Sequence, residues 1–129
     1  MEKLTSIQII EIARQLKTIA RSISDFQIEN WSNLSTDDFN KLNKNERDIL
    51  LTVQDLIAQS VIVLAENSEN LILKVNDITS RINTTLKQID NINKAIEIAT
   101  ASVFLVSAIV SHNPSALKLS IESIIEKLE

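Results

Sequence analysis

The sequence predicts an all-α helical bundle whose helices pack along seams of the coiled-coil type. Apolar residues recur at alternating steps of three and four between residues 71 and 110, with Thr85 as the one polar member, and this spacing is the period of a helix seam. The seam consists of Leu71, Val75, Ile78, Ile82, Thr85, Ile89, Ile92, Ile96, Ala99, Val103, Val106 and Val110. The 129 residues include no Gly and one Pro, whereas tight β-hairpins need residues at positive φ. We therefore expect helices and no sheet.

The first two helices are expected over residues 3–29 and 36–66. The seam of the first consists of Ile9, Ile12, Leu16, Ile19, Ile23 and Phe26. Before the second, Ser35 stands three residues ahead of Asp38, which is typical of a helix N-cap, and an acidic residue in the first turn interacts favourably with the positive end of the helix dipole. Residues 30–34 form the connection.

The uninterrupted seam predicts a third helix over residues 70–111, roughly 60 Å long at 1.5 Å per residue. The sequence leaves open whether residues 66–70 turn the chain or continue as helix, and the tolerance of Asn for the left-handed conformation favours the turn. Asn113 followed by Pro114 is typical of a helix start. A short fourth helix is therefore expected over residues 114–128.

The three long helices are expected to run up, down and up as one antiparallel bundle, a single domain over residues 1–129, with the short helix folded back on the third. Near its start the third helix is polar off its seam, so Asn76 and Asn83 are expected to face away from the core. From Ile98 onward it is apolar on all sides. We expect the short helix to cover this apolar part.

Apolar residues also lie off the main seams at the end of the bundle where the third helix begins. They are Ile62, Ile72 and Leu73. An exposed apolar patch built from them would exceed what soluble monomers usually carry. We therefore expect a homodimer, formed through this end of the bundle or along the second helix.

One segment has the composition of a membrane span. The twenty residues from Ile98 to Leu117 carry no formal charge, and about twenty apolar residues can cross a bilayer. The densely apolar part stops at Val110, and so short a run is more often a buried core helix. Core packing is the favoured interpretation, and insertion from a soluble form is the alternative. The residues that define this candidate membrane or interface segment are Ile98, Val103, Phe104, Leu105 and Ile109.

Residue types that carry chemistry are scarce. The chain has no Cys, and His112 is its only His, so neither a zinc-type cluster nor a nucleophile with its base is expected. A phosphate-binding loop needs Gly. We expect no catalytic, cofactor or metal site and no enzyme activity. The net charge of −4, without a tail of one sign, argues against a nucleic-acid partner.

One charged surface stands out. Arg14, Lys17 and Arg21 fall on the outer side of the first helix, and antiparallel packing would bring Lys44 and Arg47 of the second helix toward them. Such a patch could bind an acidic partner or anionic headgroups. A solvated face with ordinary ion pairs is the alternative.

The function expected from these features is protein–protein interaction or self-association by a helical bundle. The first ten residues lack the composition of a secretory signal, which favours a cytoplasmic location. The competing class is a membrane-active protein, pore-forming or membrane-inserting, that uses residues 98–128. The two classes differ in a measurable property, because only the second would float with anionic liposomes.

Overall fold

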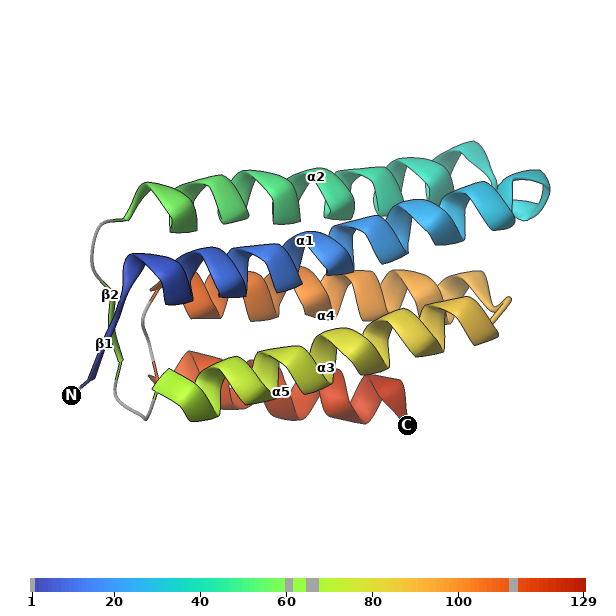
Figure 1. The fold of residues 1–129 in the computed structure, drawn as a ribbon. Coiled ribbons are helices and arrows are strands. Elements are labelled where there is room, and N and C mark those ends of the chain that lie inside the picture. The colour runs from blue at the N-terminus through green and yellow to red at the C-terminus, as the bar shows by residue number, and fades with distance from the viewer. Residues whose placement is uncertain (1, 60–61, 65–67, 112–113) are drawn as a thin grey trace.

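Five α-helices dominate the computed structural model, which describes residues 2–59, 62–64, 68–111 and 114–129. They are α1 (Ser6–Glu29), α2 (Thr36–Ala58), α3 (Ser68–Gln88), α4 (Ile92–Ser111) and α5 (Pro114–Leu128). A short 3-10 helix, η1 (Trp31–Asn33), joins α1 to α2, and two strands, β1 (Glu2–Leu4) and β2 (Ile62–Leu64), pair in antiparallel fashion. The α-helices comprise about four fifths of the chain (Figure 1). The predicted all-α class is confirmed.

Side-chain caps begin both N-terminal helices. The Thr5 hydroxyl accepts a hydrogen bond from the Gln8 amide at 3.2 Å, and the Gln8 side chain accepts one from the Thr5 amide at 2.9 Å, which completes a capping box. The Ser35 hydroxyl accepts from the Asp38 amide at 3.1 Å, so the predicted cap of α2 is confirmed. The first helix begins at Ser6 rather than residue 3, because the preceding residues form β1.

The prediction of a second helix over residues 36–66 is wrong at its C-terminal end. The helix stops at Ala58, and Gln59 is extended, with φ −79° and ψ 131°. The chain then enters β2, where Ile62 pairs with Leu4 and Leu64 with Glu2. Ile and Val favour strands as readily as helix seams, so apolar spacing could not separate a short strand from another helical turn. The expectation of no sheet fails at this one ladder.

The prediction of a single third helix over residues 70–111 is also wrong. Residues 89–91 leave the helix, and α3 and α4 run in opposite directions (Figure 1). The Asn91 side-chain oxygen accepts from the Lys94 amide at 3.1 Å, and the Asn91 carbonyl accepts from the Ala95 amide at 3.1 Å, so Asn91 begins α4. A straight helix would carry the apolar part of α4 away from the rest of its own chain. Burial of that surface therefore favours the fold-back.

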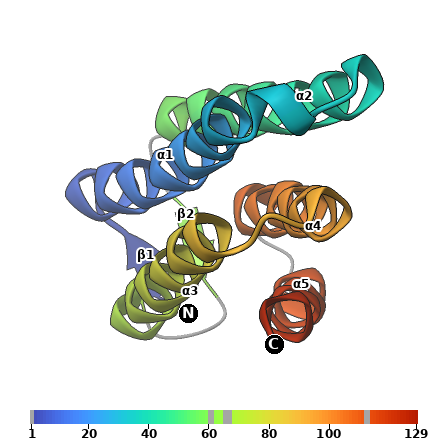
Figure 2. The same cartoon turned by 90° about the vertical axis from the view of Figure 1, so that its right-hand side faces the viewer.

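Seen from the end, the helices form a ring in the order α1, α2, α4, α5, α3 (Figure 2). The pairs α1–α2, α1–α3, α2–α4 and α4–α5 pack closely, and α5 also lies against α3. The consecutive helices α3 and α4 approach each other little along their lengths. α5 therefore folds back on α4, as predicted. Side chains with no more than 1% exposure in the core include Ile12, Leu16, Ile19, Leu42, Ile49, Leu56, Ile82 and Ile98.

Some predicted features fall beyond the described residues. Of residues 66–70, where the sequence left a turn or a helix open, Ser68 to Asn70 belong to α3, and residues 65–67 lie outside the described ranges. His112 and the predicted cap residue Asn113 also lie outside them. The predicted fourth helix agrees with α5, Pro114–Leu128.

Candidate functional site

Four exposed aliphatic side chains belong to the parts of α1, α2 and α3 nearest the end of the bundle where α1 and α3 begin and α2 ends, and these helix ends lie on one side of the molecule (Figure 1). Ile7 and Ile10 of α1 are 80% and 60% exposed, Leu73 of α3 is 65% exposed, and Ile57 of α2 is 45% exposed. We call these four residues the apolar pole. Exposure of apolar surface to water is unfavourable. The apolar pole is therefore a candidate interface.

The two strands lie at the same end (Figure 1). Among the described residues β1 and β2 are each other's only strand neighbours, so each has one edge that pairs with no other described strand. An open edge presents N–H and C=O groups that can pair with another chain. Of the three residues that the sequence places here, Leu73 is exposed, Ile72 is half-buried, and Ile62 lies in β2.

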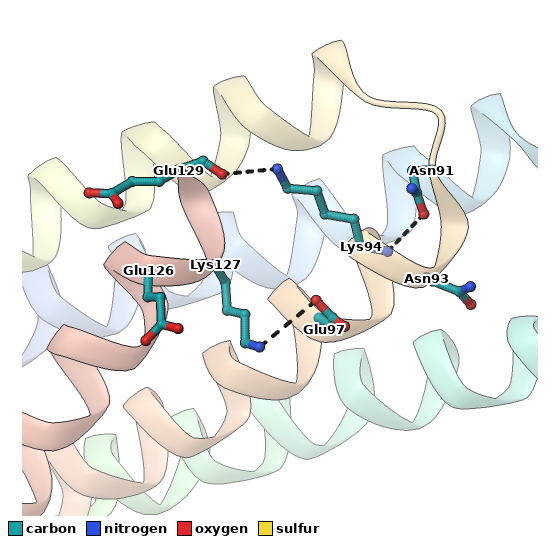
Figure 3. A pocket seen from close by; sticks show the side chains of 7 residues that line it. All are labelled: Asn91, Asn93, Lys94, Glu97, Glu126, Lys127 and Glu129. Atoms are coloured by element: carbon teal, nitrogen blue, oxygen red, sulfur yellow. Dashed lines mark hydrogen bonds and ion pairs between the residues drawn. The ribbon is translucent and has the colours of Figure 1, made fainter.

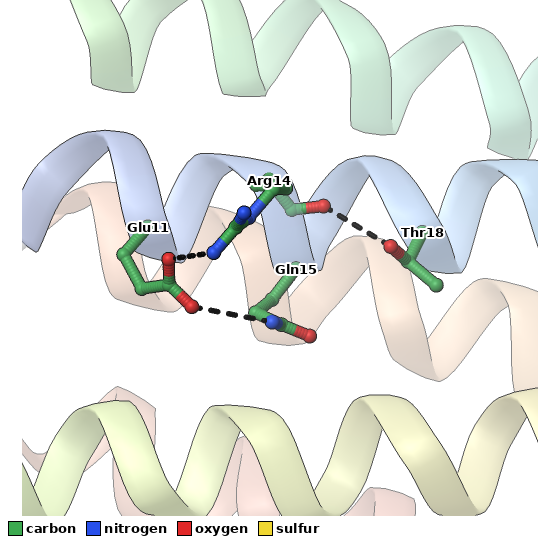
Figure 4. A network of polar contacts seen from close by, with 4 residues as sticks. All are labelled: Glu11, Arg14, Gln15 and Thr18. Carbon is green, nitrogen blue, oxygen red and sulfur yellow. Dashed lines mark hydrogen bonds and ion pairs between the residues drawn. The ribbon is translucent and has the colours of Figure 1, made fainter.

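The basic residues predicted on α1 are exposed, and one of them is paired on its own helix. Arg14 forms an ion pair with Glu11, whose other carboxylate oxygen accepts a hydrogen bond from Gln15 Nε2 at 3.4 Å (Figure 4). Lys17 and Arg21 are exposed as well. Arg14, Lys17 and Arg21 therefore form a row of solvated cations, and Glu11 partly offsets its positive charge. That is the arrangement expected of an ordinary helix surface.

The basic residues predicted on α2 are exposed too, and acids accompany them. Lys44 Nζ lies 2.8 Å from a carboxylate oxygen of Asp48, and Arg47 is exposed. Between them, Glu46 is partly buried, and desolvation raises the pKa of its carboxyl group above the ordinary value. This part of the surface therefore carries mixed charge, which gives a weak attraction to anionic partners.

A polar pocket of about 430 Å³ lies where α4 begins and α5 ends (Figure 3). Its lining residues are Asn91, Asn93, Lys94, Glu97, Glu126, Lys127 and Glu129. Lys94 Nζ donates to the Glu129 carbonyl at 3.2 Å, and Lys127 Nζ lies 3.9 Å from a Glu97 carboxylate oxygen. Both lysines thus fasten the end of α5 to α4. Within the described residues, no cluster of three or more His, Asp or Glu side chains could hold a metal ion.

The candidate membrane segment lies on α4 and is divided between core and surface. Ile98, Leu105 and Ile109 are no more than 3% exposed, and Val103 is half-buried. Phe104 is 65% exposed, which corrects the expectation that the short helix covers this whole stretch. α4 has the length and the mean hydropathy, 1.6, of a bilayer span, and half of it is buried in the bundle. A core helix has the same properties.

Sequence reasoning missed a polar contact between α1 and α3. The Ser22 hydroxyl is hydrogen-bonded to Asn83 Oδ1 at 2.8 Å, with Ser22 only 4% exposed. The expectation that Asn76 and Asn83 face away from the core is wrong, because Asn76 Oδ1 is buried as well. The sequence signal for this polar contact was the seven-residue spacing from Gln15 to Ser22 and from Asn76 to Asn83. Such steps place polar residues on one helix face.

Comparisons with protein families, with curated proteins and with solved structures find no match to this chain. No relative therefore transfers a role to any residue.

Proposed function

We propose that this protein has a binding role rather than a catalytic one, and that it self-associates through the apolar pole. The observation that carries the proposal is the exposure of Ile7, Ile10 and Leu73, each at least 60% exposed on helices that begin at one end of the bundle. Removing one such side chain from water contributes about 1.5–3 kcal/mol. Burial of all three side chains against a second copy of this chain would therefore favour association.

A second copy is the partner that fits this surface best. Most homodimers are two-fold symmetric, so the same patch meets itself across the interface. The apolar pole can satisfy that condition because its four residues are all aliphatic, so an aliphatic side chain of one copy would meet an aliphatic side chain of the other. The open edges of β1 and β2 could also pair across the two-fold axis and extend the ladder to four strands.

The test is the mass of the protein in solution as its concentration rises. Light scattering should show growth from the 14.5 kDa monomer toward a dimer. In the double variant Ile7→Asp, Leu73→Asp, association should weaken by at least about tenfold, since each buried charge costs more than the roughly 1.4 kcal/mol that a tenfold change represents.

The matched control is Ile28→Asp. Ile28 is 69% exposed, close to the 65% of Leu73, but it lies near the end of α1, at the opposite end of the bundle from the apolar pole (Figure 1). This variant should associate as the original protein does. A 14.5 kDa mass at every concentration, or equal weakening by the control, would contradict an interface at the apolar pole.

A second candidate function is membrane insertion by α4 and α5. The observation that favours it is α4 itself, 20 residues long with a mean hydropathy of 1.6. Insertion would require α4 to leave α2, so the bundle would open first. The core interpretation expects no dye release from anionic vesicles at neutral pH.

Phe104→Asp separates the two interpretations of α4. Because Phe104 is 65% exposed, the variant should keep its fold, whereas a charge near the centre of an inserted helix costs about 2.5–3.5 kcal/mol. Dye release that this variant abolishes, and that Leu51→Asp on the exposed side of α2 leaves unchanged, would establish insertion. Absence of release from the unmodified protein would reject it.

A further inference from the structure

We propose that two copies of this chain exchange their α4–α5 hairpins by straightening the joint at residues 89–91, which gives a domain-swapped dimer. At this joint the periodicity of the sequence and the path of the chain disagree. The apolar seam continues through it without a change of step, at Thr85, Ile89, Ile92 and Ile96. The structure nevertheless folds back there.

Little in the joint itself resists a continuous helix. It contains neither Gly nor Pro, the residues that most oppose helix formation. Asp90 and Asn91 are exposed, so straightening breaks no core contact of these two residues, and Ile89, half-buried against the core, is the one joint residue whose packing would change. The local interaction that favours the turn is the Asn91 cap on the Lys94 amide, and a continuous helix would replace it with backbone hydrogen bonds.

The hairpin can move as one unit. α4 and α5 pack on each other, while α4 reaches the remainder of the bundle mainly through α2, and α5 through α3. Moving the hairpin uncovers Ile98 and Leu105, which are at most 1% exposed when it is docked. Exposure of this apolar surface to water is unfavourable. A second chain that has moved its own hairpin offers the identical site, and reciprocal exchange satisfies both.

The end of the bundle at the joint has a surface that exchange would cover. The α1–α2 connection and the joint lie at the same end (Figure 1). There Ile28 is 69% exposed, and Trp31, which stacks edge-on against Phe39 with ring centroids 5.2 Å apart, is 65% exposed. A straightened α3–α4 helix carries its hairpin past this end, so the joint ends of the two copies meet. Ile28 and Trp31 then lie between them.

Cross-linking between separate chains tests the exchange directly. Thr100 of α4 is exposed and Asn45 of α2 is half-buried, and their side chains are 3.4 Å apart. Because the sequence has no Cys, Asn45→Cys can be placed in one chain and Thr100→Cys in another. The two are mixed unfolded, refolded together and treated with a short bismaleimide. Exchange places α2 of one chain against α4 of the other, so we expect a 45–100 product between chains.

Joint variants give the proposal its own controls. Asn91→Ala removes the cap and favours the straight helix, and should raise the interchain product about fivefold. Asp90→Pro opposes the straight helix and should lower it at least about a hundredfold. Asp90→Gly, which places no ring against the turn, should lower it less. Circular dichroism and thermal melting establish that each variant is folded before it is scored.

The outcomes separate this inference from self-association at the apolar pole. An interchain 45–100 product that responds to the joint variants and persists in Ile7→Asp, Leu73→Asp supports exchange. Dimers that form without this product leave the apolar pole as the interface and overturn exchange. In the cross-linked dimer, the fluorescence of Trp31, the only Trp, should shift to shorter wavelength. An unchanged emission would contradict the covering of the joint end.

Discussion

Replacing Phe26 by Ala is expected to lower the free energy of unfolding by about 3–5 kcal/mol, because it leaves a cavity where a large side chain was. Phe26 is 1% exposed and lies near the end of α1. Globular domains of this kind have a total stability of only about 5–15 kcal/mol, so the variant should be close to unfolding at room temperature. Chemical denaturation followed by circular dichroism measures the change.

Ile28→Ala is the matched control on the same helix. Ile28 stands two residues further along α1 and is 69% exposed, so its truncation should change the unfolding free energy by no more than about 0.5 kcal/mol. A similar loss in both variants would show that the buried face of α1 has been assigned wrongly.

Ending the chain at Ser111 is expected to make the protein aggregate. The truncation removes α5, which packs on α4 and α3 and places Ile124 in the core at 0% exposure. Leu105 and Ile109 of α4 should then face solvent. Strong binding of an apolar fluorescent dye and a rise in scattered light should follow, since large exposed apolar patches promote association.

The untruncated chain with Leu119→Asp is the control for this truncation. It alters an exposed residue of α5 and keeps the packing of that helix, so it should stay soluble without binding the dye. A truncated chain that remained monomeric and melted cooperatively would mean that α5 is not a necessary part of the core.

Most of the core was predictable because seam residues of an amphipathic helix keep a fixed period wherever their partner lies. Every member of the α1 seam from Ile9 to Phe26 is buried, as predicted. For the long seam of residues 71–110, the predicted burial holds better before residues 89–91 than after them. Leu71, Val75 and Ile78 of α3 are buried, whereas Ile96 and Val103 of α4 are only half-buried. The seam residues Ala99 and Val106 of α4 are buried, and after the fold-back a second face of α4 is buried beside them, with Ala95, Ile98, Ser102, Leu105 and Ile109.

The wrong predictions of exposure and burial share one physical cause. The spacing of residues along one helix does not reveal which side chains of another helix they will contact. Asn83 is polar and off the seam, yet Ser22 of α1 meets it at 2.8 Å. Phe104 is aromatic and yet exposed. The predicted exposure of Leu73 is confirmed, because fewer neighbouring helices are available to cover a side chain at the end of the bundle.

The ladder between β1 and β2 has a consequence for the order in which the chain becomes structured. It joins Leu4 to Ile62, so it closes a loop of about sixty residues, for which the logarithmic law gives an entropy cost of roughly 4 kcal/mol. Three residue pairs cannot supply that alone. The hairpin of α1 and α2 must close the loop first, and the strands then pair at little further cost. The ladder between β1 and β2 is therefore the last part of this end to form and the first to open. A second chain that pairs with either strand would compete only with the ladder and would not have to unfold the helices.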